Sequence, residues 1–237
     1  METPDSPCLL RIRWIRALDI LQYSLFVLGL FLLVPPLARD WFNPMTPWYL
    51  VPAVPLAAPA LLLPSRSGDG TLDAALWRLR VAALLGLGLS PFVYWYRNAG
   101  ENLYLLLGAF LGVLCFFWYL GEYTGLLERT AGRMAEPDLE RRARLVRQAI
   151  LYLGAVPLIS LHVSFLIWPI IMPHYSFSDL VTLWFHTPVL FVTVMTLPPV
   201  LLFLYITPFR RRAMQWPDSA WEQAAQPSDH RPDTLRG

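Results

Sequence analysis

The chain has 237 residues, of which 56% are apolar and 15% are charged. Soluble domains carry about 25% charged residues, so this composition argues against an ordinary soluble protein and favours one embedded in lipid. The formal net charge of +2 offers no basic surface of the kind that binds nucleic acid. We therefore expect the lipid bilayer, and no nucleic acid, as a partner.

Six apolar runs with few charges follow one another along the chain. About 20 residues at 1.5 Å per residue cross the hydrocarbon core of a bilayer as a helix. The sequence therefore predicts an all-α bundle of six transmembrane helices in one domain, between a basic tail at 1–18 and a polar tail at 210–237. The predicted spans are 19–37, 47–64, 79–96, 102–121, 149–171 and 188–207.

The first run follows three arginines, as a signal peptide would. It is too long for the apolar region of a signal peptide, and Pro36-Leu-Ala38 is a poor cleavage site, which favours an uncleaved first span. In the second span, Pro52, Pro55 and Pro59 are spaced to share one helix face. Each proline removes a backbone donor, and in lipid the freed carbonyls need neighbouring helices or water. We therefore expect this span to lie inside the bundle rather than at its rim.

The fourth span contains Gly108 and Gly112, a pair of small residues four apart that favours close contact with another helix. After this span, residues 122–148 form the largest charged segment between two spans, and we expect two helical pieces in it. Leu139, Ala143 and Val146 fall on one face of the second piece, which predicts an amphipathic helix.

Arginines on the other faces of this amphipathic helix make it a candidate for contact with anionic lipid or a partner protein. The candidate residues are Arg141, Arg144 and Arg147, and Glu140 and Arg144 are spaced to form an ion pair. The alternative is that these arginines only fix the orientation of the chain in the membrane.

Arginine positions predict that orientation. With six spans, all 19 arginines except Arg39 and Arg97 lie on one side of the membrane. Basic loops stay in the cytoplasm, so both termini are expected there, in a bacterial inner membrane. On the opposite side, Asp179 and the residues after it favour a short helix that lies in the membrane interface.

His162 is the one side chain in the fifth span that titrates near neutral pH, and it lies roughly 15–20 Å from either end of the charge-free run. An ionisable group at this depth is costly, which makes it a candidate functional residue. The alternative is a neutral imidazole that bonds a backbone carbonyl or a nearby hydroxyl such as that of Ser160 or Ser164.

Three residues on the outer side have side chains that bind metal ions: His174, Asp179 and His186. No metal-binding spacing accompanies them, so ordinary interfacial residues are the competing interpretation. Ser90 precedes a proline and offers a hydroxyl for intramembrane hydrolysis, but no Gly-x-Ser-x-Gly motif surrounds it. We therefore expect no catalytic residue and no cofactor.

The leading functional hypothesis is a non-enzymatic membrane protein: a small subunit, scaffold or assembly factor of a membrane complex, bound to other subunits or to itself. Its basis is the lack of buried acids, paired charges and catalytic motifs in the spans. The alternative is a transporter or channel for a small solute that uses His162 and the proline-broken helices.

Overall fold

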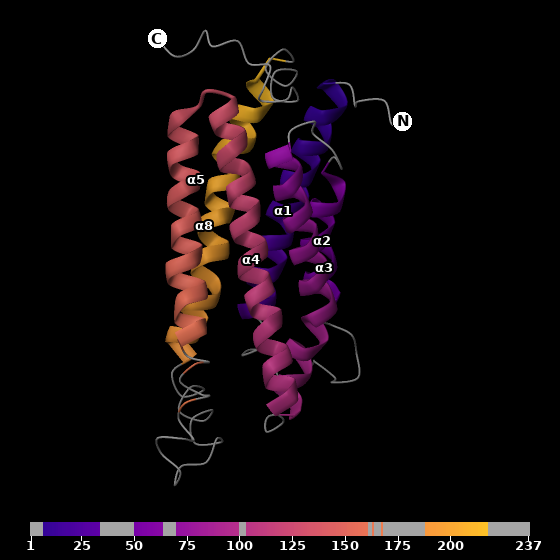
Figure 1. Ribbon diagram of the computed structural model, residues 1–237, viewed down its shortest axis with the longest axis vertical. Coiled ribbons are helices and arrows are strands. Elements are labelled where there is room, and N and C mark those ends of the chain that lie inside the picture. Colours follow the sequence, from indigo (N-terminus) through magenta and orange to yellow (C-terminus); the bar gives the residue numbers. More distant parts are fainter. Residues whose placement is uncertain are drawn as a thin grey trace.

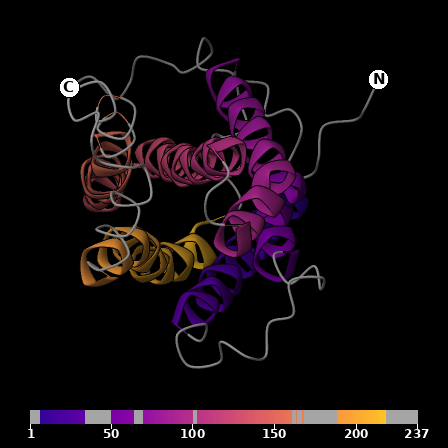
Figure 2. The ribbon, with the colours of Figure 1, turned by 90° about the horizontal axis from the view of Figure 1, so that it is seen from below.

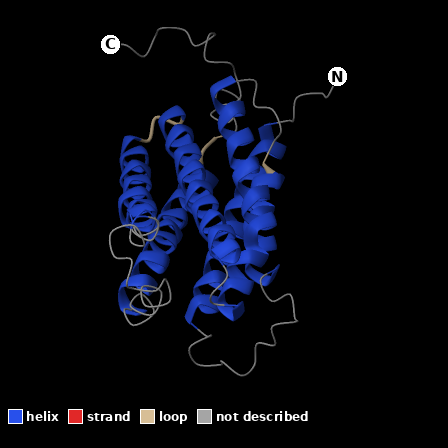
Figure 3. Cartoon of the chain, turned by 60° about the horizontal axis from the view of Figure 1, so that its bottom comes forward, coloured by secondary structure: helices blue, strands red, loops and turns tan. Residues whose placement is uncertain are grey.

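A computed structural model describes residues 7–33, 50–63, 70–99, 103–160, 163, 167 and 188–217. Within these ranges all regular structure is helical, which confirms the all-α prediction (Figure 3). The six α-helices are α1 (Pro7–Leu33), α2 (Leu50–Leu62), α3 (Gly70–Ala99), α4 (Leu103–Arg133), α5 (Pro137–Ala149) and α8 (Pro188–Gln215). A π-helical turn, η1 (Ile150–Ala155), follows α5 without a break.

The helices run up and down side by side (Figure 1). Each described helix packs against the next one along the chain, and α8 closes the ring by packing against both α5 and α1. Figure 2, which looks at the bundle from below, shows the helices following one another around it in this order. As a result, one end of the molecule, the top in Figure 1, holds the start of α1, the turn from α4 into α5, and the end of α8.

One hydrophobic core joins all the described helices. Leu18 and Leu21 of α1, Leu79 of α3 and Leu120 of α4 are completely buried in it. On α8, Phe209 packs between Tyr205 and Trp216, with ring centroids 5.9 Å and 5.6 Å apart. This continuous burial fixes how the helices are placed relative to one another.

The turn between α4 and α5 follows from its residues. Ala135 adopts a left-handed backbone with φ of 54°, and the amides of Ala135 and Glu136 bond the carbonyls of Gly132 and Ala131. This is the Schellman arrangement that ends many helices. Pro137 then begins α5, where a missing amide proton costs nothing. The expected break of 122–148 into two helical pieces is therefore confirmed.

The π-helical turn has a local cause in Pro157. Proline lacks the amide proton that would bond the carbonyl of Leu153, and its ring crowds that carbonyl. One wider turn relieves the conflict, and the amide of Val156 bonds the carbonyl of Leu151, five residues back. Residues 156–160 then continue as α-helix. The amphipathic helix and the start of the expected fifth span are thus one continuous rod.

Two predicted packing features have different outcomes. Gly108 lies so close to α3 that a β-carbon there would stand 2.5 Å from Cδ1 of Phe92, which confirms a close helix contact at this glycine. The expectation that the second span avoids the rim is wrong for α2. Val54 and Leu61 of α2 are 50% and 54% exposed, because among the described helices α2 packs mainly against α1 and α3.

Length and composition support one membrane span among the described residues. The segment Leu107–Arg133 is long and apolar enough to cross a bilayer, and half of its most apolar stretch is buried inside the protein. The segment Ala53–Leu62 is apolar but shorter. This one segment gives weak support for a membrane location. It does not support the six predicted spans or their orientation.

Candidate functional site

Charged side chains gather at the end of the bundle where α1 begins and α4 passes into α5, which we call the charged end. There, glutamates that are mostly hidden pair with arginines from other helices. Arg78 Nε lies 3.1 Å from Glu122 Oε1, and Arg212 Nε lies 2.7 Å from Glu136 Oε1. The carboxylates are 15% and 21% exposed, and the arginines 44% and 55%. These pairs tie α3 to α4 and α8 to the turn before α5.

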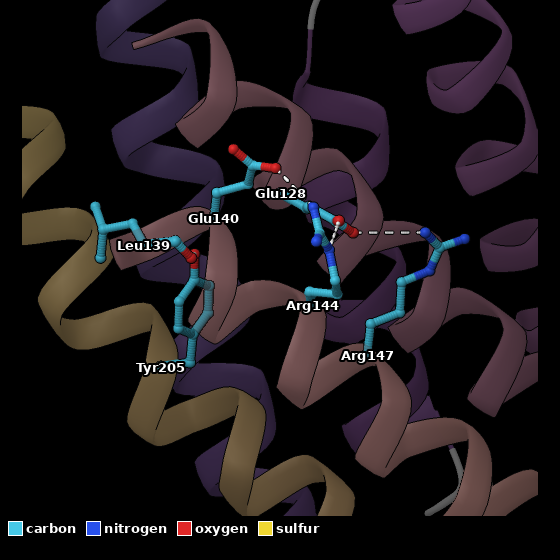
Figure 4. A network of polar contacts seen from close by, with 6 residues as sticks. All are labelled: Glu128, Leu139, Glu140, Arg144, Arg147 and Tyr205. Carbon is cyan, nitrogen blue, oxygen red and sulfur yellow. Dashed lines mark hydrogen bonds and ion pairs between the residues drawn. The ribbon is translucent and has the colours of Figure 1, made fainter. Parts of the chain in front are cut away.

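The densest group of charges lies between α4 and α5, and we call it the Glu128 cluster: Glu128, Glu140, Arg144 and Arg147 (Figure 4). Arg144 Nε donates to Glu128 Oε1 at 2.9 Å and its Nη2 donates to Glu140 Oε1 at 2.7 Å. Arg147 Nη1 lies 3.5 Å from Glu128 Oε2. One carboxylate, 17% exposed, is therefore shared by two arginines.

The hydrogen bond and the charge of Glu128 raise the pKa of Arg144. A raised pKa in the folded state adds stability at every pH below the ordinary arginine value, and that stability is lost only above it. The guanidinium therefore stays charged throughout the physiological range, and the cluster is a constant attachment rather than a pH switch.

Small residues on α4 let α5 approach at this cluster. A β-carbon at Gly125 would lie 3.4 Å from Cζ of Arg147, and one at Gly132 would lie 3.3 Å from Oε2 of Glu140. On the other side of α5, the Tyr205 hydroxyl of α8 donates to the carbonyl of Leu139 at 3.0 Å (Figure 4). Helix α5 is thus held from α4 by charge and from α8 by a buried hydrogen bond.

A further arginine at the charged end bonds the backbone. Arg80 of α3 donates from Nε to the carbonyl of Ala60 at 3.2 Å and from Nη2 to the carbonyl of Leu63 at 2.7 Å. The residue four positions after Ala60 is a proline, which has no amide proton to offer that carbonyl. The guanidinium supplies the missing donors and its charge suits the C-terminus of α2.

The predicted arginine candidates divide into two kinds. Arg144 and Arg147 are committed to Glu128 inside the molecule. Arg141 is exposed, and no carboxylate in the described part of the chain pairs with it. The other candidates, His162, His174, Asp179 and His186, lie outside the described residues.

Several serine and threonine hydroxyls in the described residues bond the backbone of their own helices. The Ser90 hydroxyl donates to the carbonyl of Leu87, and those of Ser24, Thr124 and Thr130 each donate to the carbonyl four residues back. Hydroxyls engaged in this way satisfy their own helices. In the same ranges no three His, Cys, Asp or Glu side chains gather as metal ligands would.

Sequence reasoning identified Glu140–Arg144 and missed Glu128, the acceptor at the centre of the cluster. The spacing of Glu140 and Arg144 lies within one helix, whereas Glu128 meets the arginines only after two helices fold together. A signal was present, because Gly125 and Gly132 flank Glu128 on one face of α4. Glycines around an acid on a long helix indicate that another element approaches there.

Comparisons with protein-family models, curated proteins and solved structures find no match to this chain.

Proposed function

We propose that the chain is a multi-pass membrane protein of six spans, with its charged end and both termini in the cytoplasm of a bacterial cell. The supporting pattern is the separation of charge along the bundle. No Asp, Glu or Arg occurs in 81–96 of α3, 103–121 of α4 or 188–209 of α8. At 1.5 Å per residue these stretches are about 24 to 33 Å long, close to the thickness of a hydrocarbon core.

The single observation that carries the proposal is the apolar outer surface beyond the charged end. Large apolar side chains on every described helix point outward, and many are more than half exposed. Water-soluble monomers rarely display apolar surface of this extent, whereas lipid or partner helices cover it readily. Examples beyond the charged end are Phe26, Leu84, Tyr104, Tyr152 and Leu204.

Within the membrane, the protein acts without chemistry of its own, as a small subunit, scaffold or assembly factor of a membrane complex. Its charged groups are used to attach its helices to one another, as in the Glu128 cluster. The groups left over for other molecules are exposed apolar side chains and exposed arginines such as Arg141. Surfaces of that kind suit binding to lipid and to other membrane helices.

One observation favours transport of a small solute as a second candidate function. The hydroxyls of Tyr119 and Tyr123 are buried between the helices with no hydrogen-bond partner. Pro59 and the pair Pro198 and Pro199 are buried in α2 and α8, where each proline frees a backbone carbonyl. Unused polar groups inside a bundle suit a solute path, in which His162 would be the titrating residue.

Native mass spectrometry on the protein extracted gently from its own membrane tests the leading function. A defined mass containing other chains is the expected result and would name the partners. A lone monomer or a homo-oligomer contradicts the subunit proposal and favours transport. In that case flux into proteoliposomes, compared between the natural chain and His162→Ala, tests the second candidate.

Membrane location has a separate test. Alkaline carbonate releases peripheral proteins from membranes and leaves integral ones in the pellet. We expect the full chain in the pellet, and its release into the supernatant would contradict the membrane proposal before any partner is sought.

A further inference from the structure

The seam between α1 and α8 joins the first and last described helices at the charged end. Arg210 Nε of α8 lies 2.5 Å from Asp19 Oδ1, a contact of opposite charges rather than an aligned hydrogen bond. One turn further in, Gln22 Nε2 donates to Thr207 Oγ1 at 3.0 Å. Toward the end of the helices, the Arg11 guanidinium donates to a carbonyl near the end of α8, that of Met214. These contacts fix the two helices antiparallel.

Two arginines close in the chain to these contacts remain outside the ion pairs. Arg16 precedes Asp19 by one helical turn, and Arg211 directly follows Arg210. Both side chains are exposed, and neither has a carboxylate partner in the part of the chain that the structure describes. Because Asp19 offsets only one charge, that of Arg210, this end of α1 and α8 keeps an excess of positive charge.

Below these arginines the seam is bordered by exposed apolar side chains on both helices. On α1, Tyr23 and Phe26 follow Asp19 by four and seven residues, on the same side of the helix, and are 73% and 55% exposed. On α8, Leu204 and Val200 precede Arg211 by seven and eleven residues and are 60% and 48% exposed. At 1.5 Å per residue, exposed apolar side chains therefore reach about 10 Å from Asp19 along α1 and about 16 Å from Arg211 along α8.

We propose that this seam binds one molecule of an acidic phospholipid. Its phosphate contacts the guanidinium groups of Arg16 and Arg211, and its acyl chains lie along Tyr23, Phe26 and Leu204. Guanidinium groups match phosphate oxygens in shape and charge, which makes arginine suited to this headgroup. A soluble acidic peptide would satisfy the arginines but leave the apolar stripes uncovered, whereas a phospholipid satisfies both. The inference rests on the proposed membrane location and is independent of any partner subunit.

The test is native mass spectrometry of the purified full chain in a non-ionic detergent, titrated with phosphatidylglycerol or phosphatidylcholine. We expect the natural chain to bind phosphatidylglycerol at least fivefold more tightly. We expect the double variant Arg16→Gln/Arg211→Gln to bind phosphatidylglycerol roughly 25-fold more weakly, since each arginine near an anionic lipid contributes a factor of about five to the affinity. The charge-conserving variant Arg16→Lys/Arg211→Lys should keep most of the preference.

The matched comparison sets Arg142→Gln, which removes one charge from an exposed side chain of α5, against the single variants Arg16→Gln and Arg211→Gln. We expect less than a twofold change in Arg142→Gln, because α5 is not one of the two helices of the seam. Equal losses in the three single variants would show general attraction to a basic surface, and no preference between the two lipids would show no acidic-lipid site. Either result overturns the proposal. The titration counts lipid on the lone chain, so its failure is distinct from a failure to find partner subunits.

Discussion

At the charged end, ion pairs and arginines that bond backbone carbonyls join neighbouring helices, and Gly125 and Gly132 leave room for these charged side chains. In the apolar part of the bundle, glycines face aromatic rings instead. Arg144 and Arg80 are examples of the first kind of attachment. Gly154 and Gly108, which leave room for the rings of Phe117 and Phe92, are examples of the second. The difference suits a chain whose charged end meets water and headgroups. Where lipid surrounds the helices, close van der Waals contact replaces charge.

The largest expected effect comes from filling the space at Gly154, in the apolar part. A β-carbon there would stand 2.2 Å from Cε1 of Phe117, whose side chain is buried in the core. We expect Gly154→Ala to lower the free energy of unfolding in mixed micelles by about 2 to 3 kcal/mol. The control is Gly121→Ala, where nothing lies within 4 Å. Equal stability of the two variants would contradict the close contact between α4 and η1.

The next effect tests the attachment of α2 at the charged end. Arg80→Met removes the donors to the carbonyls of Ala60 and Leu63 and keeps an unbranched side chain in place of the aliphatic part of the arginine. Hydrogen bonds from a charged donor contribute about 1.5 to 3 kcal/mol, so we expect unfolding in mixed micelles to need about 2 kcal/mol less. Arg142→Met changes an exposed arginine without such bonds and should have little effect. If both variants behave alike, Arg80 is not needed to cap α2.

Two tyrosine-to-phenylalanine changes should have opposite signs. Tyr205→Phe removes a hydrogen bond to the carbonyl of Leu139 and should cost about 1 kcal/mol of unfolding free energy. Tyr123→Phe removes a buried hydroxyl that has no partner, so stability should stay the same or rise. Equilibrium unfolding of the two single variants measures both. A loss of stability in Tyr123→Phe would mean that a bound polar molecule satisfies this hydroxyl.

The smallest effect concerns the turn between α4 and α5. Ala135 has a left-handed backbone, which glycine adopts at no steric cost. Ala135→Gly should therefore raise the unfolding free energy by about 0.5 to 1 kcal/mol. The same change at Ala74, an exposed position within α3, should lower it by a similar amount. A decrease at both positions would contradict the left-handed turn.

The helices could be predicted from the sequence because apolar runs, prolines and charge clusters act locally. The amphipathic stripe of α5 is confirmed, with Leu139, Ala143 and Ile150 buried in the core. The Glu140–Arg144 pair is confirmed for the same reason, since both residues lie on one helix. Span lengths describe the helices less well. Helix α1 already begins at Pro7, and α4 continues from its apolar part to Arg133 without interruption.

Contacts between helices could not be predicted, because no local pattern says which faces meet. Glu128 receives two arginines from α5, and Asp19 meets Arg210 from 191 positions away in the chain. The same gap explains the error at α2. Pro59 is buried and Pro55 is half-buried, but Val54 and Leu61 on the same helix are exposed. The sequence predicts which face of α2 carries the prolines, but it does not predict how many helices pack against α2.

The π-helical turn η1 changes how the following residues are counted around the helix. An α-helix advances about 100° per residue, so the one extra residue in the turn rotates everything after it by roughly that angle. Leu158 is buried and Ile159 is 43% exposed on this shifted register. Deleting one residue within Ile150–Ala155 would keep a continuous helix yet bring a different set of side chains to face α4. The number of residues in this one turn therefore decides which side chains beyond Ala155 face α4, whatever the identity of those side chains.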